Sequence, residues 1–388
     1  MDETAARDWA ESGAAWLTGH PDGPPLLPPG NAATWARRMT DHIEAASGVD
    51  LDGATLLSER AAFTGARRHG ACSAGGACRL LPTLDGWAAV SNARPDDPML
   101  LSALISGAPD ENLDNALADW VRAHPGAELD ERAGLLSVAA SSCMPRAFTV
   151  PEPGQPRPVE DLLVVDFSAL WAGPLCGHLL ALAGARVVKV ETPQRPDGAR
   201  YGNKDFYDLL HGGTRSVVLD PREPAQRRAL QALVAKADIV IEASRPRALA
   251  GFGLDAAEFV ANGGTWVSIT AWGRDSDRVG FGDDVAAASG LIARDGSGLP
   301  VFCGDAIADP LTGLTAAALA MSDPGRGVLW EVPMAGVVSA TVPEPWPVAP
   351  SETAWDAVPP VARKPLSAAP APGADTAEVL SSLRIPVP

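Results

Sequence analysis

Short apolar runs separated by helix-forming segments fill the middle of the sequence, from Val159 to about Ala340. Such runs are typical of strands that are buried on both faces of a sheet. They occur at Leu162–Phe167, Arg186–Glu191, Ser216–Asp220, Asp238–Glu242 and Thr265–Thr270. Helices are expected between them, for example at Gly173–Ala183 and Glu223–Lys236. This alternation predicts right-handed βαβ units and an α/β fold with a Rossmann-like, doubly wound parallel sheet.

The first 144 residues carry a different pattern, which predicts a smaller α+β domain. Helices are expected at Asn31–Ser47, Glu59–Arg68, Pro98–Ser106 and Leu113–Ala123, and strands at Cys78–Leu81 and Trp87–Asn92, after a glycine turn. Residues 145–158 are rich in proline and are expected to form a linker to the sheet domain, 159–340. A second proline-rich stretch, 341–388, is expected to be a tail that wraps over the surface, with one short helix at Thr376–Leu383.

The net charge of −17 limits the possible partners. A negative field disfavours nucleic acid and anionic membranes, although a few arginines and backbone N–H groups can still hold an anionic ligand locally. No apolar run approaches the roughly eighteen residues of a membrane span, and the acidic N-terminus lacks a signal-peptide core. The five cysteines have no metal-ligand spacing. We therefore expect a cytoplasmic protein with no metal.

Common catalytic motifs are missing from the sequence. The segment SALWAGPLCG occupies the turn after the first strand of the sheet, where a dinucleotide-binding protein would carry G-x-G-x-x-G. No Walker loop, H-E-x-x-H or G-x-S-x-G occurs. None of the six histidines lies beyond His211, so the later part of the chain offers no histidine as a general base.

Several segments, in order, resemble the class III CoA-transferases, the family of formyl-CoA and carnitine CoA-transferases and 2-methylacyl-CoA racemases. They are VVDFSALWAGPLCGHLLALAGARVVKVETP, FYDLLHGGTRSVVLD, ADIVIEASRPRALAGFGLD, VSITAWG, DDVAAASGL and FCGDAIADPLTGLTAAALA. The resemblance implies coenzyme A as a substrate in the form of acyl-CoA, a carboxylic acid as the second substrate, and a homodimer. The early segment HGACSAGGACRLLPTLDGWAAVSNARPDD is similar to a later part of the same family, so the parts occur in a changed order.

The resemblance points to Asp305 as the nucleophile, since the matching aspartate of the family attacks the thioester and forms a mixed anhydride. The chemistry is reasonable, because the thiolate of coenzyme A is a good leaving group. A structural alternative is a turn in which Asp305 caps the helix expected at Pro310–Met321. Gly75 and Gly76 are expected to supply N–H groups to the thioester oxyanion or to close a lid, or else to form only a tight turn.

Further residues at matching positions are expected to bind coenzyme A. They are Leu170, Trp171, Ala172, Thr192, Arg215, Ser244, Arg245 and Arg247. Thr192 stands where some relatives carry a basic residue, so Arg195 or Arg200 are alternatives for the phosphates. Trp171 stands where formyl-CoA transferase-like members carry glutamine, which disfavours very small polar acyl groups. For each arginine, a solvated charge or a structural ion pair is the alternative.

Asp283 and Asp284 are expected near the substrate, where racemase members carry a His-Asp pair; a solvated acidic turn is the alternative.

Three functions follow. The first is CoA transfer between an acyl-CoA and a carboxylic acid through Asp305. The second is 2-methylacyl-CoA racemisation or epimerisation, which needs a second acid–base group and is disfavoured by the absent histidine. The third is a non-catalytic CoA-binding subunit.

Overall fold

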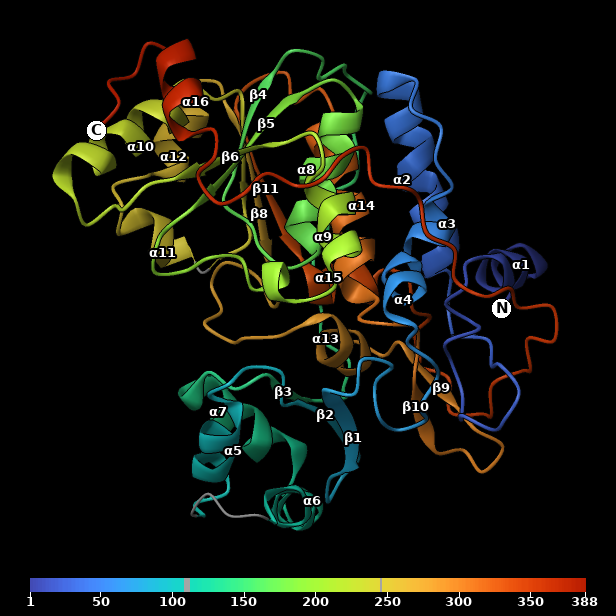
Figure 1. Ribbon diagram of the computed structural model, residues 1–388. Helices are drawn as coiled ribbons and strands as arrows, with labels where there is room; N and C mark the ends of the chain where they lie inside the picture. Colours follow the sequence, from blue (N-terminus) through green and yellow to red (C-terminus); the bar gives the residue numbers. More distant parts are fainter. Residues whose placement is uncertain (108–111, 245) are drawn as a thin grey trace.

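The computed structural model describes residues 1–107, 112–244 and 246–388 (Figure 1). Its centre is a six-stranded sheet of order β11-β8-β7-β4-β5-β6, in which every neighbouring pair is parallel. The strands are β4 (Leu163–Asp166), β5 (Arg186–Glu191), β6 (Arg215–Val218), β7 (Ile239–Glu242), β8 (Thr265–Thr270) and β11 (Val328–Pro333). The predicted fold class is confirmed. Only β11 was not predicted, because this edge strand is partly exposed and Glu331 interrupts its apolar run.

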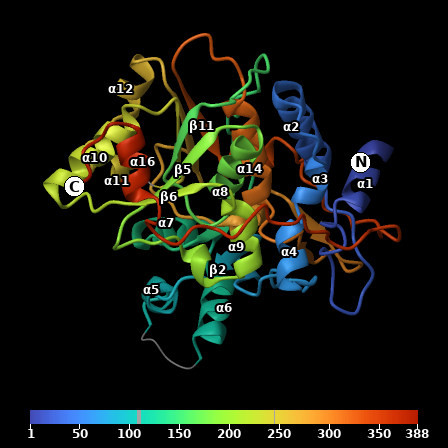
Figure 2. The ribbon, with the colours of Figure 1, turned by 45° about the horizontal axis from the view of Figure 1, so that its top comes forward.

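Helices cover both faces of the sheet because neighbouring strand residues point to opposite sides. Val164 belongs to the larger hydrophobic core and Val165 to the core on the other face. On the larger side lie α8 (Ala172–Leu182), α14 (Ala308–Ala320) and α15 (Met334–Ser339), and on the other lie α10 (Pro224–Val234), α12 (Ala256–Ala261) and α16 (Thr376–Ser382) (Figures 1 and 2). Nearly all of α14 is buried, which explains why its sequence is apolar on all sides.

The first helices pack against the sheet domain and not against the small sheet that follows them. They are α1 (Glu3–Glu11), α2 (Ala32–Ser47), α3 (Gly53–Leu56) and α4 (Glu59–Thr64). Trp9, Met39 and Ile43 lie in the same core as Leu311 and Leu314 of α14. The stretch expected to be one α+β domain, 1–144, is thus divided between two cores.

A small unit holds the second of these cores. It consists of β1 (Cys78–Pro82), β2 (Trp87–Ser91) and β3 (Ala140–Ser142), with α5 (Asp97–Leu104), α6 (Leu113–Ala123) and α7 (Gly126–Leu136). Its strands pair in the order β1-β2-β3, antiparallel throughout. The two predicted strands and the two predicted helices of this region are present, whereas α7 and β3 were not predicted. Figure 1 shows the small unit below the sheet domain.

The proline-rich tail crosses the surface before it ends on the sheet. The N–H of Leu27 donates to the carbonyl of Glu352 at 2.8 Å, and the N–H of Val358 donates to that of Ala10 at 3.0 Å. The tail ends in α16, which was predicted and whose Leu380 is fully buried in the second core.

The connecting elements are the 3₁₀ helix η1 (Gly198–Tyr201), α9 (Lys204–His211), α11 (Pro246–Ala250), α13 (Gly282–Ala288), β9 (Ile292–Arg294) and β10 (Pro300–Phe302). Within the described ranges, no helix combines the length and apolarity that a membrane crossing would need.

Candidate functional site

The strand order creates a switch point at the centre of the sheet. From β4 the chain moves outward to β5 and β6, and it then returns to place β7, β8 and β11 on the other side of β4. In open α/β sheets, ligands bind in the crevice outside the carboxyl ends of the strands at such a point. Leu170 follows β4 and Ser244 follows β7, and both line a cleft there.

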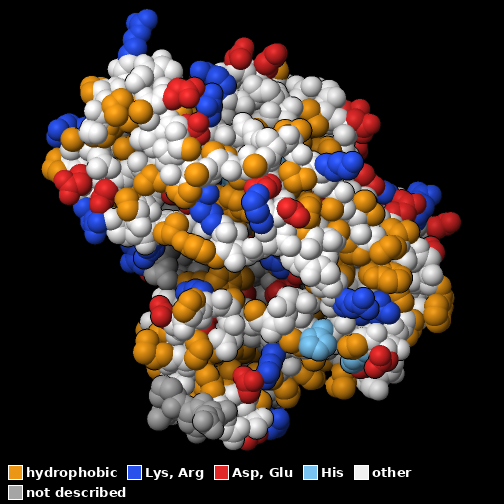
Figure 3. Space-filling view, viewed as in Figure 1, with side chains coloured by type: hydrophobic (Ala, Val, Ile, Leu, Met, Phe, Trp, Pro, Cys, Tyr) orange, Lys and Arg blue, Asp and Glu red, His pale blue; other side chains and the backbone are white. Residues whose placement is uncertain are grey.

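The cleft has a volume of about 690 Å³ and lies between the sheet domain and the small unit. Figure 3 shows the surface hollowed between these two parts. Among its described lining residues are four arginines, Arg94, Arg195, Arg247 and Arg278, but only one acid, Asp309. Three of these arginines are paired with aspartates that do not line the cleft: Arg94 with Asp97, Arg247 with Asp277 and Arg278 with Asp130. Their guanidinium groups still offer N–H donors to a phosphate-bearing ligand.

The predicted cofactor-binding residues divide into two groups. Four of them line the cleft: Leu170, Ala172, Ser244 and Arg247. Trp171 and Thr192 do not line it: Trp171 is buried beneath the cleft wall, and Thr192 is bridged to Arg195, which does line it. Arg245 lies outside the described residues.

Two of the predicted or alternative phosphate ligands are engaged elsewhere. Arg215 pairs with Asp375 at 2.9 Å and with Glu378 at 3.0 Å, at the edge of the sheet where α16 packs. Arg200 is bound by both oxygens of the buried Glu191. Neither arginine is among the residues that line the cleft, so the structural ion pair considered for Arg215 is the arrangement found.

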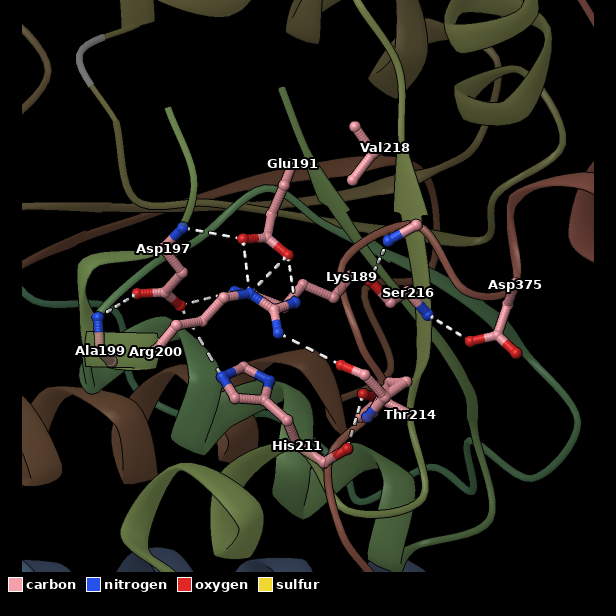
Figure 4. A network of polar contacts seen from close by, with 12 residues as sticks. Lys189, Glu191, Asp197, Ala199, Arg200, His211, Thr214, Ser216, Val218 and Asp375 are labelled. Carbon is pink, nitrogen blue, oxygen red and sulfur yellow. Dashed lines mark hydrogen bonds and ion pairs between the residues drawn. The ribbon is translucent and has the colours of Figure 1, made fainter. Parts of the chain in front are cut away.

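A buried polar network fixes the backbone of Leu170 at the cleft. Leu170 has a φ of +70°, a conformation that is unfavourable for a branched side chain. Its N–H donates to Oδ1 of Asp197 at 3.0 Å. Asp197 in turn lies 2.8 Å from Nζ of Lys189 and 3.8 Å from Nε2 of His211 (Figure 4). Burial lowers the pKa of His211 well below its ordinary value, so neutral imidazole stands beside this ion pair.

Asp305 lies in a strained turn between β10 and α14. Gly304 has a φ of +68° and Ala306 a φ of +45°, and the second value is unfavourable for alanine. Oδ1 of Asp283 accepts the N–H of Ala306 at 2.8 Å, which holds this conformation. The position that caps α14 is Ile307, and no side chain caps this helix. The alternative in which Asp305 is a helix cap is therefore wrong.

The Asp305 carboxylate is bound by an arginine that the sequence analysis did not single out. Nε of Arg60, on α4, donates to Oδ2 at 2.9 Å, and Nη2 donates to Oδ1 at 2.5 Å, although the residues are 245 positions apart. The guanidinium also stacks on the ring of Trp171, 4.7 Å from its centre. The sequence around Arg60 gave no sign of this role, because a basic residue on a short amphipathic helix is usually solvated.

The glycine loop, which contains Gly75 and Gly76 and precedes β1 of the small unit, lies next to Asp305 and Arg60. A Cβ on Gly75 would lie 3.8 Å from Oδ1 of Asp305 and 3.8 Å from Nη2 of Arg60. Gly76 has a φ of +80° and faces open space, so it serves the turn. The structure thus brings together Asp305 and Gly75, which the sequence had associated only through a family resemblance.

Two further aspartates, Asp283 and Asp309, lie near this turn, and Asp284 follows Asp283 in the chain. Burial is the first cause that raises the pKa of Asp283 to about 6 and that of Asp309 to about 7, and the charge of Asp305 adds to both. Asp284 is fully buried and binds the Ser91 hydroxyl at 3.0 Å, so its side chain connects α13 to the small unit. Asp283 and Asp309 therefore belong with Asp305, whereas Asp284 does not. Of the predicted substrate residues, neither Asp283 nor Asp284 lines the cleft.

Comparison with known proteins finds relatives for the part of the chain that forms the sheet. Residues 159–344 match the family model described as CoA-transferase family III. The chain is similar to a succinyl-CoA–D-citramalate CoA-transferase of Chloroflexus aurantiacus, with 33% identity over 176 residues, 42% of this chain and 44% of that protein. It is also similar to a succinate–glutarate CoA-transferase of Agrobacterium fabrum, with 32% identity over 182 residues, 42% of this chain and 46% of that protein.

The crystal structure of a CaiB/BaiF family protein from Brucella suis aligns with a TM-score of 0.43 and 28% identity, over 48% of this chain and 55% of that chain. The alignments with the two curated relatives span less than half the length of each. The matched part contains the central strands of the sheet, the turn of Asp305 and helix α14. Residues 159–344, just under half of the chain, therefore resemble CoA-transferase family III.

Proposed function

We propose that the protein transfers coenzyme A between an acyl-CoA thioester and a carboxylic acid, with Asp305 as the nucleophile. The observation that carries the proposal is the position of Asp305. It is a buried carboxylate in a strained turn beside the glycine loop, four positions before Asp309, which lines the cleft. Strained backbone that is held by several contacts is typical of functional sites.

In the proposed reaction, an oxygen of Asp305 attacks the thioester carbon, the C–S bond breaks, and the thiolate of coenzyme A leaves. The product is a mixed anhydride between Asp305 and the acyl group. The thiolate then attacks the Asp305 carbonyl, which releases the donor acid as a carboxylate and leaves a thioester on Asp305. The acceptor acid reverses these two steps, forms its own acyl-CoA and restores the Asp305 carboxylate, so no oxidant or external nucleophile is consumed.

The residues of the cleft suggest how the coenzyme is held. Arg195 and Arg247 are exposed beside Leu170 and Ser244, and we assign them to the phosphates. Arg247 also pairs with Asp277 on the surface, so a phosphate would share this arginine with Asp277. Gly75 lies next to Asp305, and we assign its backbone N–H to the thioester oxyanion. The similarity to transferases of succinyl-CoA, succinate and glutarate suggests short dicarboxylic acids as substrates to try first. The homodimer and the cytoplasmic location stay predictions.

The test is acyl exchange between succinyl-CoA and a panel of carboxylic acids, followed by chromatography of the thioesters. Asp305→Asn should lower the rate on the order of 10³-fold or more, because the amide is no nucleophile. Asp323→Asn, an exposed aspartate beyond the same helix, is the matched control. Hydroxylamine added during turnover should leave a hydroxamate on Asp305, detectable by peptide mass spectrometry. Full activity of Asp305→Asn, or a hydroxamate on Asp283 alone, would contradict the assignment.

The same assay separates the two alternatives. A racemase would incorporate deuterium from the solvent at the α-carbon of a 2-methylacyl-CoA, with or without an acceptor acid. A non-catalytic subunit would bind coenzyme A, with no exchange for any thioester in the panel. We expect exchange that depends on the acceptor acid and no catalytic deuterium incorporation, since no histidine is among the described residues that line the cleft.

A further inference from the structure

The ion pair with Arg60 hinders any reaction at the Asp305 carboxylate, because both of its oxygens are already bound. Both oxygens of Asp305 are bound by the one guanidinium. The Asp305 side chain is 1% exposed and that of Arg60 is 28% exposed, so solvent reaches the pair through the arginine. A molecule that approaches the pair therefore meets Arg60 first.

Arg60 is held so that it stays at this place and stays charged. The ring of Trp171 covers one face of the guanidinium, and the edge of Phe206 packs against Trp171 with ring centres 5.3 Å apart. The charges of Asp305, Asp283 and Asp309 together raise the pKa of Arg60 against the opposing effect of burial. A cation fixed in this way is stabilised by a carboxylate partner.

Space for one more atom exists beside the ion pair, on the side of the glycine loop. A Cβ on Gly75 would be in ordinary contact, at 3.8 Å, with both Arg60 and Asp305. The glycine therefore leaves room for about one heavy atom directly against the ion pair. A larger side chain at this position would close the approach.

We propose that Arg60 is the receptor for the carboxylate of the substrate acid, and that it exchanges Asp305 for this acid during turnover. When Asp305 becomes an anhydride or thioester, it loses its negative charge, and the guanidinium loses the carboxylate that accepts its two hydrogen bonds. The released donor acid or the incoming acceptor acid is the carboxylate that the reaction itself provides at that moment. The exchange would hold the acid beside the acyl-aspartyl carbonyl with which it reacts. This role in turnover rests on the proposed function, whereas carboxylate binding by Arg60 does not.

Carboxylate binding is tested without any enzymatic assay. Asp305→Ala removes the partner of Arg60 and leaves a cavity in its place. Sodium acetate should then raise the melting temperature of Asp305→Ala in a saturable manner, whereas sodium chloride at equal ionic strength should not. The double variant Asp305→Ala/Arg60→Met should show no acetate effect. Equal stabilisation by acetate and chloride, or an equal response of the double variant, would overturn the proposal.

Should Asp305→Ala fail to fold, Asp305→Asn keeps the side-chain shape and is titrated in the same way. Trp171 then gives a second readout, because acetate bound to Arg60 lies next to its indole. Acetate should change the tryptophan fluorescence of Asp305→Asn, and this change should be absent when Trp171→Phe is added. A change that persists without Trp171 would place the acetate elsewhere.

The role of Arg60 in turnover is tested by comparing the KM for the acid with the KM for the acyl-CoA. Arg60→Lys keeps the charge but loses the paired donors, so the KM for the acid should rise about tenfold while the KM for the acyl-CoA stays within about twofold. Parallel changes in both KM values, or a loss of kcat alone, would overturn the receptor role. If the wild-type protein shows no transfer with any acid, the proposed function fails, and the acetate titration still decides whether Arg60 binds carboxylates.

Discussion

The two carboxylate oxygens of Asp284 have different surroundings, and this difference bears on whether the buried side chain is charged or neutral. Oδ1 accepts the Ser91 hydroxyl at 3.0 Å and the Phe281 N–H at 2.8 Å. Oδ2 is buried and has no hydrogen-bond partner among the described residues. Burial raises the pKa of Asp284 from 3.8 to about 7. The fold therefore favours the neutral acid, in contrast to Asp305, which has a cation on both oxygens.

We expect Asp284 to make the folded state less stable as the pH rises. The folded protein binds this proton more tightly than the unfolded chain, so stability is lost as the pH rises from about 4 to about 7. Asp284→Asn removes the titration, so its stability relative to the wild type should increase over that interval. Since a tenfold change in proton affinity corresponds to ~1.4 kcal/mol, the increase is on the order of 4 kcal/mol at most.

Urea unfolding of both proteins at about pH 5 and about pH 8 measures this difference. Asp114→Asn, on the surface of the small unit, is the control and should differ from the wild type equally at both pH values. A difference between Asp284→Asn and the wild type that stays constant with pH would show that Asp284 is ionised throughout.

At the scale of elements, helix α4 connects the C-terminal tail to the candidate site. Glu59 begins this helix and is 3% exposed at its side chain, and the next residue is Arg60. The side chain of Arg363, in the tail, donates to both oxygens of Glu59 at 2.8 Å, and its backbone N–H adds a third bond at 2.9 Å. The tail therefore fixes the element that carries the partner of Asp305.

We expect Arg363→Met to destabilise the protein by about 3 kcal/mol, because it leaves the buried Glu59 without its cation. Transfer activity should fall as well, since α4 would no longer hold Arg60 in place. The double variant Arg363→Met/Glu59→Gln should recover part of the stability, as both charges are then absent. Arg38→Met is the matched control, because its pair with Glu152 is exposed on both sides and contributes less than ~1 kcal/mol. Equal losses for Arg363→Met and Arg38→Met in thermal unfolding would contradict this account.

At the scale of the whole molecule, charge is distributed unevenly. The chain carries a net charge of −17, yet the described lining of the cleft has four arginines and one aspartate. The overall field repels an anionic ligand at long range, while the arginines attract it at short range. Binding of coenzyme A should therefore depend on these few contacts.

We expect the Kd for coenzyme A to rise several-fold between about 50 mM and about 500 mM NaCl, because salt screens the contacts of the phosphates. Pantetheine, which has no phosphate, should bind with little dependence on salt. Arg195→Ser should weaken coenzyme A binding and reduce its salt dependence, whereas Arg215→Ser, which lies away from the cleft, should do neither. Calorimetric titration measures both. A larger loss of coenzyme A affinity with Arg215→Ser than with Arg195→Ser would place the phosphate site at the edge of the sheet.

The sequence by itself determined the parallel sheet, because strands buried on both faces are short and mostly apolar and alternate with segments of helical length. Thr265–Thr270 and Leu113–Ala123 were predicted to the residue. The edge strand β11 carries Glu331 and is half-buried, so it lacked this signal. Family resemblance added Asp305 and Gly75, which no periodicity could have indicated.

Only the tertiary structure decided which distant residues meet. Arg60 binds Asp305 across 245 positions, and Arg363 binds Glu59 across 304. An arginine on a short helix has the same local sequence whether it is solvated or paired, because the pairing depends on how α4 packs against the sheet domain. The same reason explains Arg215, whose partners on α16 come from the far end of the chain. Local sequence sets the period of each element, but the partner of a long charged side chain is set by packing between elements.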